Sequence, residues 1–231
     1  MAKLSIIIPT LDEAGGIEDQ LKALQAMRSR GAELIVVDGG SRDGTPLRAR
    51  PLADRLLTAA RGRGRQMNAG AAQAKGDALI FLHADTRLPE GADELIVQGL
   101  AASGRCWGRF DVAIDGRHRL LPVIAWFMNR RSRLTGIATG DQGMFVRREV
   151  FERVGGFPDI PLMEDIVLSR RLLVIGPPLC LPQRAVTSGR RWERGGVIRT
   201  VWLMWSLRLA FRLGADPARL ARRYGYGEGN G

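Results

Sequence analysis

The chain has 231 residues, of which 45% are hydrophobic, so it is long enough for one α/β domain with a short appendage and too apolar for extensive disorder. Its two cysteines are too few for a disulfide framework, which favours a reducing cytoplasm over secretion. The net charge of +11 comes from arginines spread along a chain without a nucleic-acid-binding motif, so we expect no nucleic-acid partner; an anionic membrane surface or a phosphorylated substrate stays open.

Strands and helices alternate through the first half of the chain. Short β-branched runs at Leu4–Ile8 and Glu33–Val37 predict buried parallel strands, and the first run is too short for a secretory signal peptide. Apolar residues at helical spacing predict a helix over Gly16–Arg30 between them. The same patterns predict, in order, a helix, a strand and a helix over Arg65–Ala74, Asp77–Leu82 and Gly91–Ala102. Loops at the carboxyl ends of such strands converge on a crevice, where open α/β sheets bind ligands.

The pattern changes from Trp107 onwards. Residues Gly108–Ile114 alternate as in a strand with one exposed face, and Leu120–Asn129 predicts an apolar helix. A strand, a short helix and a longer helix are predicted over Phe145–Arg147, Arg148–Val154 and Glu164–Val174.

Polar residues follow the first two predicted strands directly. Pro9, Thr10, Asp12 and Glu13 come after the first strand, and Asp38 with Gly39 after the second. An aspartate carboxylate can accept a hydrogen bond from a ring N–H of uracil or guanine, and glycine lets the backbone approach a ligand closely. The alternatives are an acidic helix cap after the first strand and a simple Asp/Gly-rich turn after the second.

A basic segment precedes the second helix of this half. Three arginines alternate with glycines at residues 61–65. Guanidinium groups beside a helix amino terminus suit a diphosphate, and we select Arg65, with Asn68 on the same helix. A solvated basic loop is the alternative.

The third strand ends at His83-Ala84-Asp85. Mn²⁺ and Mg²⁺ prefer carboxylate and phosphate oxygens, so Asp85 together with the phosphate oxygens of a ligand can hold such an ion. Imidazole suits Mn²⁺ better than Mg²⁺, so a ligating His83 would favour Mn²⁺; a ribose contact or simple packing are the alternatives for this side chain.

Two adjacent carboxylates, Glu164 and Asp165, begin a helix. One carboxylate near a reacting hydroxyl can take its proton as a general base, and we select Asp165 for that role. Glu164 would raise the proton affinity of Asp165 if both faced the pocket. The alternative is a pair of helix caps.

The carboxyl-terminal part is apolar, aromatic and basic. Residues Val197–Leu213 are interrupted by three arginines, and their uncharged run is too short to span a bilayer. Membrane contact and a homodimer interface both stay open; aromatic and basic residues together suit an anionic leaflet, where a lipid or lipid-phosphate acceptor would be natural. The glycine-rich end, Gly225–Gly231, is predicted to be loose.

Taken in order, these segments resemble family 2 glycosyltransferases. Residues Ser5–Glu13 resemble the family's first strand and loop, with Asp12 in the place of an Asn, and Val36–Thr45 resembles its second strand and Asp-x-x-Ser-x-Asp-Gly-Thr loop. His83-Ala84-Asp85 lies where the family has its Asp-x-Asp metal motif. The segments at 140–148, 154–158 and 163–165 follow in the order of the family's acceptor side. Arg191 and Trp192 are similar to the Arg-Trp pair of processive members, but Gln183 lies too far upstream to complete that motif.

The resemblance implies a GT-A (Rossmann-like) α/β domain with a mostly parallel central sheet. We expect this domain over residues 1–196, with the nucleotide-sugar half at 1–105 and the acceptor half at 106–196, followed by a helical appendage and loose tail at 197–231. The implied reaction is non-processive, inverting, metal-dependent transfer from a UDP- or GDP-linked sugar to an acceptor hydroxyl, by a cytoplasmic protein that binds peripherally to the inner face of the membrane if the acceptor is lipid-linked. The implied nucleotide-binding residues are Pro9, Thr10, Asp12, Glu13, Asp38, Gly39, Arg65, Asn68, His83 and Ala84; the metal ligand is Asp85, the catalytic residues are Asp165 and Glu164, and Asp141, Gln142, Arg191 and Trp192 lie near the acceptor or diphosphate.

Two other functions are weighed against this one. Sugar-nucleotide nucleotidyltransferases share a similar sheet but carry a glycine-rich phosphate loop after the first strand, where this chain has Pro9–Glu13. A membrane-associated scaffold without catalysis is suggested by His83 and the incomplete Arg-Trp motif, and the presence of Asp85 and Asp165 argues against it.

Overall fold

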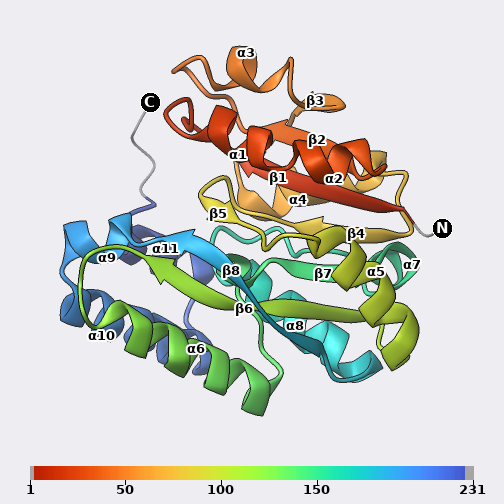
Figure 1. Cartoon of the computed structure of the whole chain (residues 1–231). Coiled ribbons are helices and arrows are strands. Elements are labelled where there is room, and N and C mark those ends of the chain that lie inside the picture. The colour runs from red at the N-terminus through yellow and green to blue at the C-terminus, as the bar shows by residue number, and fades with distance from the viewer. Residues whose placement is uncertain (1–2, 227–231) are drawn as a thin grey trace.

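The computed structural model describes residues 3–226. Within them, one mixed eight-stranded sheet runs through the molecule in the order β3-β2-β1-β4-β7-β6-β8-β5, with helices on both faces (Figure 1). The strands are β1 (Leu4–Thr10), β2 (Glu33–Asp38), β3 (Arg55–Thr58), β4 (Ala78–Phe81), β5 (Thr86–Arg87), β6 (Trp107–Asp115), β7 (Met144–Arg147) and β8 (Leu179–Ser188). The helices are α1 (Ile17–Ala23), α2 (Gln25–Ser29), α3 (Thr45–Ala49), α4 (Arg63–Gln73), α5 (Ala92–Ser103), α6 (Leu121–Thr135), α7 (Arg148–Arg153), α8 (Glu164–Ile175), α9 (Arg190–Gly195), α10 (Val197–Arg212) and α11 (Pro217–Tyr224), with a 3₁₀ turn η1 (Gly140–Gln142).

The two halves of the sheet differ in strand direction. Strands β1 to β4 pair in parallel, as predicted from their buried β-branched runs. Strand β7 is antiparallel to both β4 and β6, and β5 is antiparallel to β8, whereas β6 and β8 are parallel. The predicted α/β fold is therefore confirmed, and the parallel arrangement is confined mostly to its first half.

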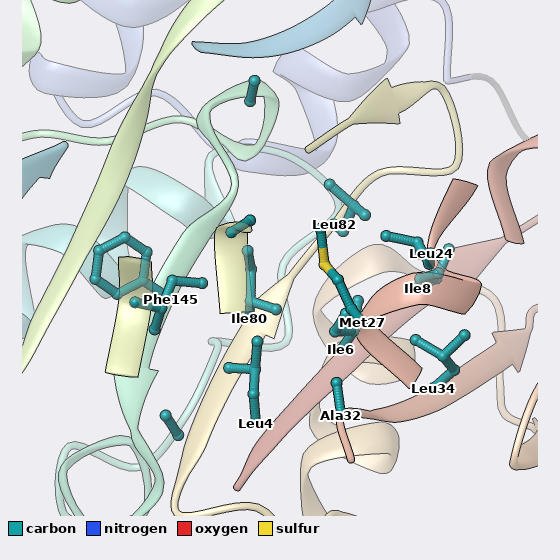
Figure 2. Close-up of a cluster of buried hydrophobic side chains, with 14 of the residues drawn as sticks. Leu4, Ile6, Ile8, Leu24, Met27, Ala32, Leu34, Ile80, Leu82 and Phe145 are labelled. Atoms are coloured by element: carbon teal, nitrogen blue, oxygen red, sulfur yellow. The ribbon is translucent and has the colours of Figure 1, made fainter. Parts of the chain in front are cut away.

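The core lies on both sides of β1, because successive residues of a strand point to opposite faces. Ile6 and Ile8 pack beneath α1 and α2 against Leu24 and Met27 (Figure 2), while Ile7 faces α4. The single helix predicted over Gly16–Arg30 is broken at Leu24, which separates α1 from α2.

Helix α4 approaches the sheet closely at Gly70. A Cβ atom at this position would lie 2.5 Å from Cγ2 of Ile7 and 3.0 Å from Cγ2 of Val37. Only a hydrogen fits there without a shift, so Gly70 sets the depth at which α4 lies on β1 and β2.

Strand β8 and the short elements α3, β3 and β5 were not predicted. Strand β8 contains Pro182, followed by the polar Gln183 and Arg184, and this interruption weakens its strand pattern. The structure accommodates the proline at a register shift, since Phe110 pairs with Leu181 and Asp111 with Arg184, skipping two residues of β8.

The carboxyl-terminal helices are part of the fold. Leu207 of α10 and Leu220 of α11 are buried against Met163 and Ile166 at the start of α8. The appendage predicted to be helical from residue 197 onwards contains α10 and α11. None of the helices within residues 3–226 combines the length and apolar character needed to cross a bilayer. Of the tail predicted to be loose, residues 227–231 lie outside the described part of the chain.

Candidate functional site

A cavity of about 1010 Å³ opens at the carboxyl end of β4. Its polar end is formed by side chains from six separate elements or loops, which the fold brings together from positions up to 129 residues apart. These side chains are Arg63, His83, Asp85, Asp141, Glu164, Asp165, Thr187, Ser188, Arg191 and Trp192. The predicted catalytic and metal-binding carboxylates therefore face one cavity.

Glu164 and Asp165 begin α8 at the inner end of this cavity. The preceding Met163 adopts a left-handed backbone with φ of 73°, unusual for a non-glycine residue, and so turns the chain into the helix. Asp165 accepts hydrogen bonds from the backbone N–H of Gly140 at 3.1 Å and of Ile166 at 2.7 Å. These contacts fix the carboxylate of Asp165 against η1.

Both carboxylic acids hold their protons more tightly than usual. Burial raises the pKa of Asp165, and the two backbone N–H donors act in the opposite direction. Burial and the neighbouring charge of Asp165 raise the pKa of Glu164 to about 7, against the lowering effect of Arg63. Burial thus contributes more to these shifts than the repulsion between the two carboxylates that was predicted to act on Asp165.

His83 is directed towards η1. Its Nδ1 lies 3.4 Å from Oδ1 of Asp141, which also accepts a hydrogen bond from Oγ1 of Thr187 at 3.4 Å. A Cβ atom at Gly140 would overlap the imidazole, so the glycine lets the ring pack against the turn. Burial favours the neutral form of Asp141, but His83, Arg63 and Thr187 outweigh it and lower the pKa of this carboxyl.

The carboxylate of Asp85 accepts no hydrogen bond from residues 3–226. Its side chain is 35% exposed, and within the described residues its nearest cation is Arg190, with Nη2 3.8 Å from Oδ2. The same guanidinium lies 3.9 Å from Oε2 of Glu13, whose pKa is raised by burial and then by the charge of Asp85. Residues 3–226 contain no group of three or more His, Cys, Asp or Glu side chains placed to hold a metal ion, so the protein offers Asp85, with Glu13 nearby, and a bound ligand would have to supply further oxygens.

Asp38 is buried at the end of β2, where its carboxylate holds its own loop. It accepts hydrogen bonds from the backbone N–H groups of Gly40 and Ser41, both at 2.9 Å, and from the hydroxyls of Ser41 and Thr10. Its predicted role at a nucleotide base therefore competes with four internal contacts.

The loops after β1 and β2 are joined by what we call the loop clasp, formed by Asp12, Ser41, Asp43 and Thr45. The backbone N–H groups of residues 12, 13 and 14 donate to Ser41 Oγ at 2.9 Å, Thr45 Oγ1 at 2.8 Å and Asp43 Oδ2 at 2.8 Å. In return, Asp12 Oδ1 accepts from the N–H of residue 42 at 2.8 Å. Sequence reasoning missed this role, although side-chain caps are frequent for Ser, Thr and Asp in turns.

Ten residues predicted to bind ligand do not line the cavity: Pro9, Thr10, Asp12, Glu13, Asp38, Gly39, Arg65, Asn68, Ala84 and Gln142. Three of them, Arg65, Asn68 and Gln142, are engaged elsewhere in the fold. Arg65 forms a bidentate ion pair with Asp159, at 2.6 and 2.9 Å, and Arg63, two residues earlier on α4, faces the cavity instead. Asn68 donates to the carbonyl oxygen of Phe157 and accepts from its N–H, both at 2.9 Å, which fixes α4 to the loop before α8. Gln142 is buried in a capping box with Thr139.

Tyr224 and Tyr226 contact two of the cavity's arginines. The guanidinium carbon of Arg191 lies 4.0 Å from the ring centroid of Tyr224, and that of Arg63 lies 5.5 Å from the ring of Tyr226. Trp192, half-buried, packs beside α6 and the start of α10. The predicted pair at 191 and 192 thus stands between the cavity and the carboxyl-terminal helices.

Arg131 of α6 also lines the cavity and was not predicted. Its Nε and Nη2 atoms are buried without a hydrogen-bond partner in the described part of the chain. Burial lowers the pKa of Arg131, an effect that the charge of Asp165 opposes. The predicted helix ended at Asn129, and so the sequence gave no reason to place residue 131 beside the catalytic carboxylates.

Comparison with sequence families and characterised relatives gives two matches. The model of the family described as glycosyl transferase family 2 matches residues 5–155. A probable glycosyltransferase of Bacillus subtilis (strain 168), YdaM, is 27% identical over 227 residues, which cover 87% of this chain and 53% of the relative. The chain therefore spans about half the length of the curated relative that it matches.

Solved structures share the fold at low sequence identity. The mannosyltransferase PcManGT from Pyrobaculum calidifontis, in complex with GDP-Man and Mn²⁺, superposes with a TM-score of 0.65 at 24% identity, over 96% of this chain and 69% of that one. Residues 1–349 of TarS from S. aureus, in complex with UDP, give a TM-score of 0.65 at 16% identity, over 80% and 60% of the two chains. Glucosyl-3-phosphoglycerate synthase from Mycobacterium tuberculosis, with Mg²⁺ and UDP, gives 0.57 at 20% identity, over 80% and 70%. At these identities the likeness shows the fold alone.

Proposed function

The chain belongs to glycosyl transferase family 2, and from that premise we propose that it transfers a sugar from a nucleoside-diphosphate sugar to an acceptor hydroxyl. The observation that carries the proposal is the cavity lined by Asp85, the buried Glu164 and the partly buried Asp165. A half-exposed carboxylate suits a metal and its diphosphate, whereas a fixed carboxylate with raised pKa suits a proton acceptor.

The donor side of the proposed site is the first half of the chain, residues 1–105. Asp38 at the end of β2 and Thr10 at the end of β1 lie where the carboxyl ends of parallel strands form a ligand crevice. UDP and GDP are both candidates, since a carboxylate can accept from the ring N–H of either base. The structural neighbours described above contain UDP or GDP-Man. Arg63 and Arg191, both lining the cavity, are the proposed contacts of the diphosphate.

A divalent ion, Mn²⁺ or Mg²⁺, fits the proposed site if the donor shares in holding it. The carboxylate of Asp85 accepts no hydrogen bond from the described residues and stands at the cavity wall, so it would hold the ion together with phosphate oxygens. Such an ion supplies Lewis-acid stabilisation of the departing diphosphate. The carboxylate of Glu13, close enough to interact with the charge of Asp85, is the proposed second oxygen ligand from the protein.

The proposed reaction inverts the anomeric carbon. Asp165 takes the proton of the acceptor hydroxyl while that oxygen attacks the anomeric carbon from the face opposite the departing nucleotide. The N–H groups of Gly140 and Ile166 hold the carboxylate in one orientation for this step. The C–O bond to the diphosphate breaks, and the charge that develops on the leaving oxygen lies towards Arg63 and Arg191.

The proposed acceptor half is residues 106–196, and its helix α6 forms the outer wall of the cavity together with α10. Exposed aromatic residues gather there on α6 and α10, Trp126 and Phe127 on the first and Trp202 and Trp205 on the second. They support a lipid-linked acceptor reached from the inner face of a membrane. A homodimer that covers the same residues is the alternative.

The test of the proposed function is calorimetric titration with UDP and GDP, each with and without Mn²⁺. We expect one nucleotide to bind, to bind more tightly with metal, and to lose the metal effect in Asp85→Ala. Turnover of the matching sugar nucleotide should release nucleoside diphosphate in wild type and fall about 10²- to 10⁴-fold in Asp165→Asn, which still binds the nucleotide. Release of pyrophosphate would indicate nucleotidyl transfer, and no binding of either nucleotide would favour a scaffold.

A further inference from the structure

The cavity extends away from the carboxylates between α6 and α10 as an apolar channel, which we call the α6–α10 groove. Its walls include Val123, Ile124 and Phe127 from α6 and Val201, Trp202 and Trp205 from α10. Both helices lie on the same side of the molecule, beyond β6 (Figure 1). The volume of about 1010 Å³ is at the upper end of the range for small-molecule sites, about 300–1,000 Å³.

The aromatic residues on the outer walls of the groove are unusually exposed to solvent. Trp202 is 71% and Trp205 is 70% exposed, and Trp126 and Phe127 are exposed across from them on α6. A contiguous apolar surface of this kind marks a binding site rather than ordinary surface variation. The groove is therefore built to take apolar material from outside the fold.

The charges around the groove are of one sign. Helices α6 and α10 together carry six arginines and no acidic residue. Arg130, Arg199 and Arg212 are exposed, and Arg208 lines the groove. Two copies of this surface brought face to face would repel each other, whereas an anionic amphiphile would be attracted. Charge complementarity thus favours an anionic ligand with an apolar chain over a second copy of the chain.

Arg131 lies where the groove meets the catalytic carboxylates. Asn129 and Arg133 hold α6 on β6, the first by hydrogen bonds to both backbone groups of Val112 at 2.8 and 2.9 Å, the second by an ion pair with Asp111 at 2.8 Å. Residue 131, two positions from each, points to the other side of the helix, into the cavity. Its buried Nε and Nη2 donors lack a partner within residues 3–226, and such donors are costly unless a ligand accepts from them.

We propose that the α6–α10 groove binds the hydrocarbon chain of the acceptor, and that Arg131 binds an anionic group of the same molecule, next to the hydroxyl that Asp165 deprotonates. This inference rests on the proposed function and names the acceptor class: a membrane amphiphile with an apolar chain, an anionic group and a free hydroxyl in its head. The polar end of the cavity receives the head, and the exposed tryptophans stand where the chain leaves the bilayer.

The test is titration of the full chain with single-chain alkyl phosphates below their critical micelle concentration. Each added methylene buried in the groove should raise the affinity about fourfold, until the chain is longer than the groove. Alkyl maltosides of matched chain length, which lack the charge, should bind at least about tenfold more weakly, because charge-assisted hydrogen bonds to Arg131 are missing.

Matched variants separate the groove from general surface effects. Arg131→Gln should weaken alkyl phosphate binding about tenfold or more and leave alkyl maltoside binding unchanged, whereas Arg199→Gln, an exposed arginine outside the groove, should change neither. Trp202→Ala should weaken both ligands; Leu209→Ala, 59% exposed on the same helix but outside the groove, should not.

The outcomes distinguish this inference from the proposed function. If UDP or GDP binds wild type and Arg131→Gln alike but no alkyl phosphate binds, the inference is wrong and the proposed function stands. If neither nucleotide nor alkyl phosphate binds, both fail. Equal affinity for charged and neutral chains would overturn the role of Arg131. A stable dimer in light scattering that Trp202→Ala dissociates, without amphiphile binding, would assign the groove to a second copy.

Discussion

Asp165 combines two opposing influences at one carboxyl group. Burial favours its protonated form, and the N–H groups of Gly140 and Ile166 favour the ionised form. The net effect raises its pKa, so the base is poised closer to neutral pH than an ordinary aspartate is. A stronger base in its ionised form takes a hydroxyl proton more readily, which is the usual reason for tuning catalytic carboxyls in this direction.

This balance predicts the acidic limb of the pH–rate profile. A base with raised pKa is ionised only above it, so kcat/KM should rise with pH through an apparent pKa above about 4, the ordinary range for aspartate. The measurement is kcat/KM against pH for wild type. A rate independent of pH from about pH 4 to about pH 8 would contradict the assignment of Asp165 as base.

Glu164 predicts how folding stability depends on pH. Its pKa rises from 4.5 to about 7 in the folded protein, so the folded state binds the proton more tightly than the unfolded state. Its contribution to stability is therefore greatest below about pH 4.5, falls as pH rises towards 7, and amounts to a loss on the order of 3 kcal/mol above it. Glu164→Gln should raise the Tm at pH 8 by several degrees and change it little at pH 4, measured by calorimetry in parallel with wild type. Equal changes at both pH values would show that ionisation of Glu164 is not the cause.

Gly70 predicts a packing effect without any change in the site. Gly70→Ala places a methyl group against Ile7 and Val37 and should reduce the free energy of unfolding by about 1–3 kcal/mol. Gly15→Ala is the matched control, because nothing lies within 4 Å of its Cβ position. Chemical denaturation of both variants measures the difference, and equal stability of the two would contradict the close contact.

At single positions, the sequence predicted which residues belong to the site better than it predicted the contacts that those residues make. It placed Asp85, Asp141, Glu164 and Asp165 at one site, because each motif has a characteristic residue in a fixed order. From the sequence we selected Arg65 rather than Arg63. Spacing alone does not show that Arg65 forms an ion pair with Asp159, which is 94 residues further along the chain. The internal contacts of Asp38 could not be read from the sequence either, because a turn aspartate and a ligand-binding aspartate have the same pattern.

Among the elements, α6 is fixed to the sheet by polar side chains, of which Asn129 bonds both backbone groups of one strand residue. Asn129 satisfies both the N–H and the C=O of Val112, next to the register shift between β6 and β8. The amide of Asn129 bonds these two groups as the backbone of a neighbouring strand would. This attachment explains how α6, with few buried residues, stays in position on the sheet. The position of Arg131 depends on this attachment.

Removing that attachment should weaken both folding and the site. Asn129→Ala leaves two backbone groups of β6 without their partner and should cost about 2–4 kcal/mol of unfolding free energy. Arg130→Ala, the exposed neighbour, should cost much less, within about 0.5 kcal/mol. Denaturant titration compares the two, and similar losses in both would show that α6 is held mainly by apolar packing.

Element prediction succeeded where hydrophobic periodicity was strong. The runs of β1, β2 and β4 and the helices α4, α5 and α8 were found to within a few residues, because both faces of these strands, or one stripe of these helices, are buried. Strand β8 was not predicted because Pro182 interrupts it. The break at Leu24 was not predicted because α1 and α2 keep the same apolar spacing. Tertiary pairing, rather than local sequence, determines such elements.

For the whole molecule, charge and aromatic surface predict membrane binding. The chain carries a net charge of +11, and α6 and α10 concentrate arginines beside exposed tryptophans. We expect binding to anionic vesicles that weakens as salt is raised, and little binding to neutral vesicles. Sedimentation with vesicles measures this, and Trp202→Ala combined with Trp205→Ala should reduce binding at every salt concentration. Binding of equal strength to neutral vesicles would contradict the electrostatic part.

The loop clasp bears on how members of such a family can diverge. Ser41, Asp43 and Thr45 hold the loop after β1 through its backbone N–H groups, and so they serve folding whether or not a nucleotide ever binds. Selection for a correctly folded chain is sufficient to preserve them after catalysis is lost. A descendant could therefore exchange Asp85 and Asp165 and still display an intact Asp-x-x-Ser-x-Asp-Gly-Thr signature. That signature therefore indicates common ancestry and fold, whereas Asp85 and Asp165 indicate whether catalytic activity is kept.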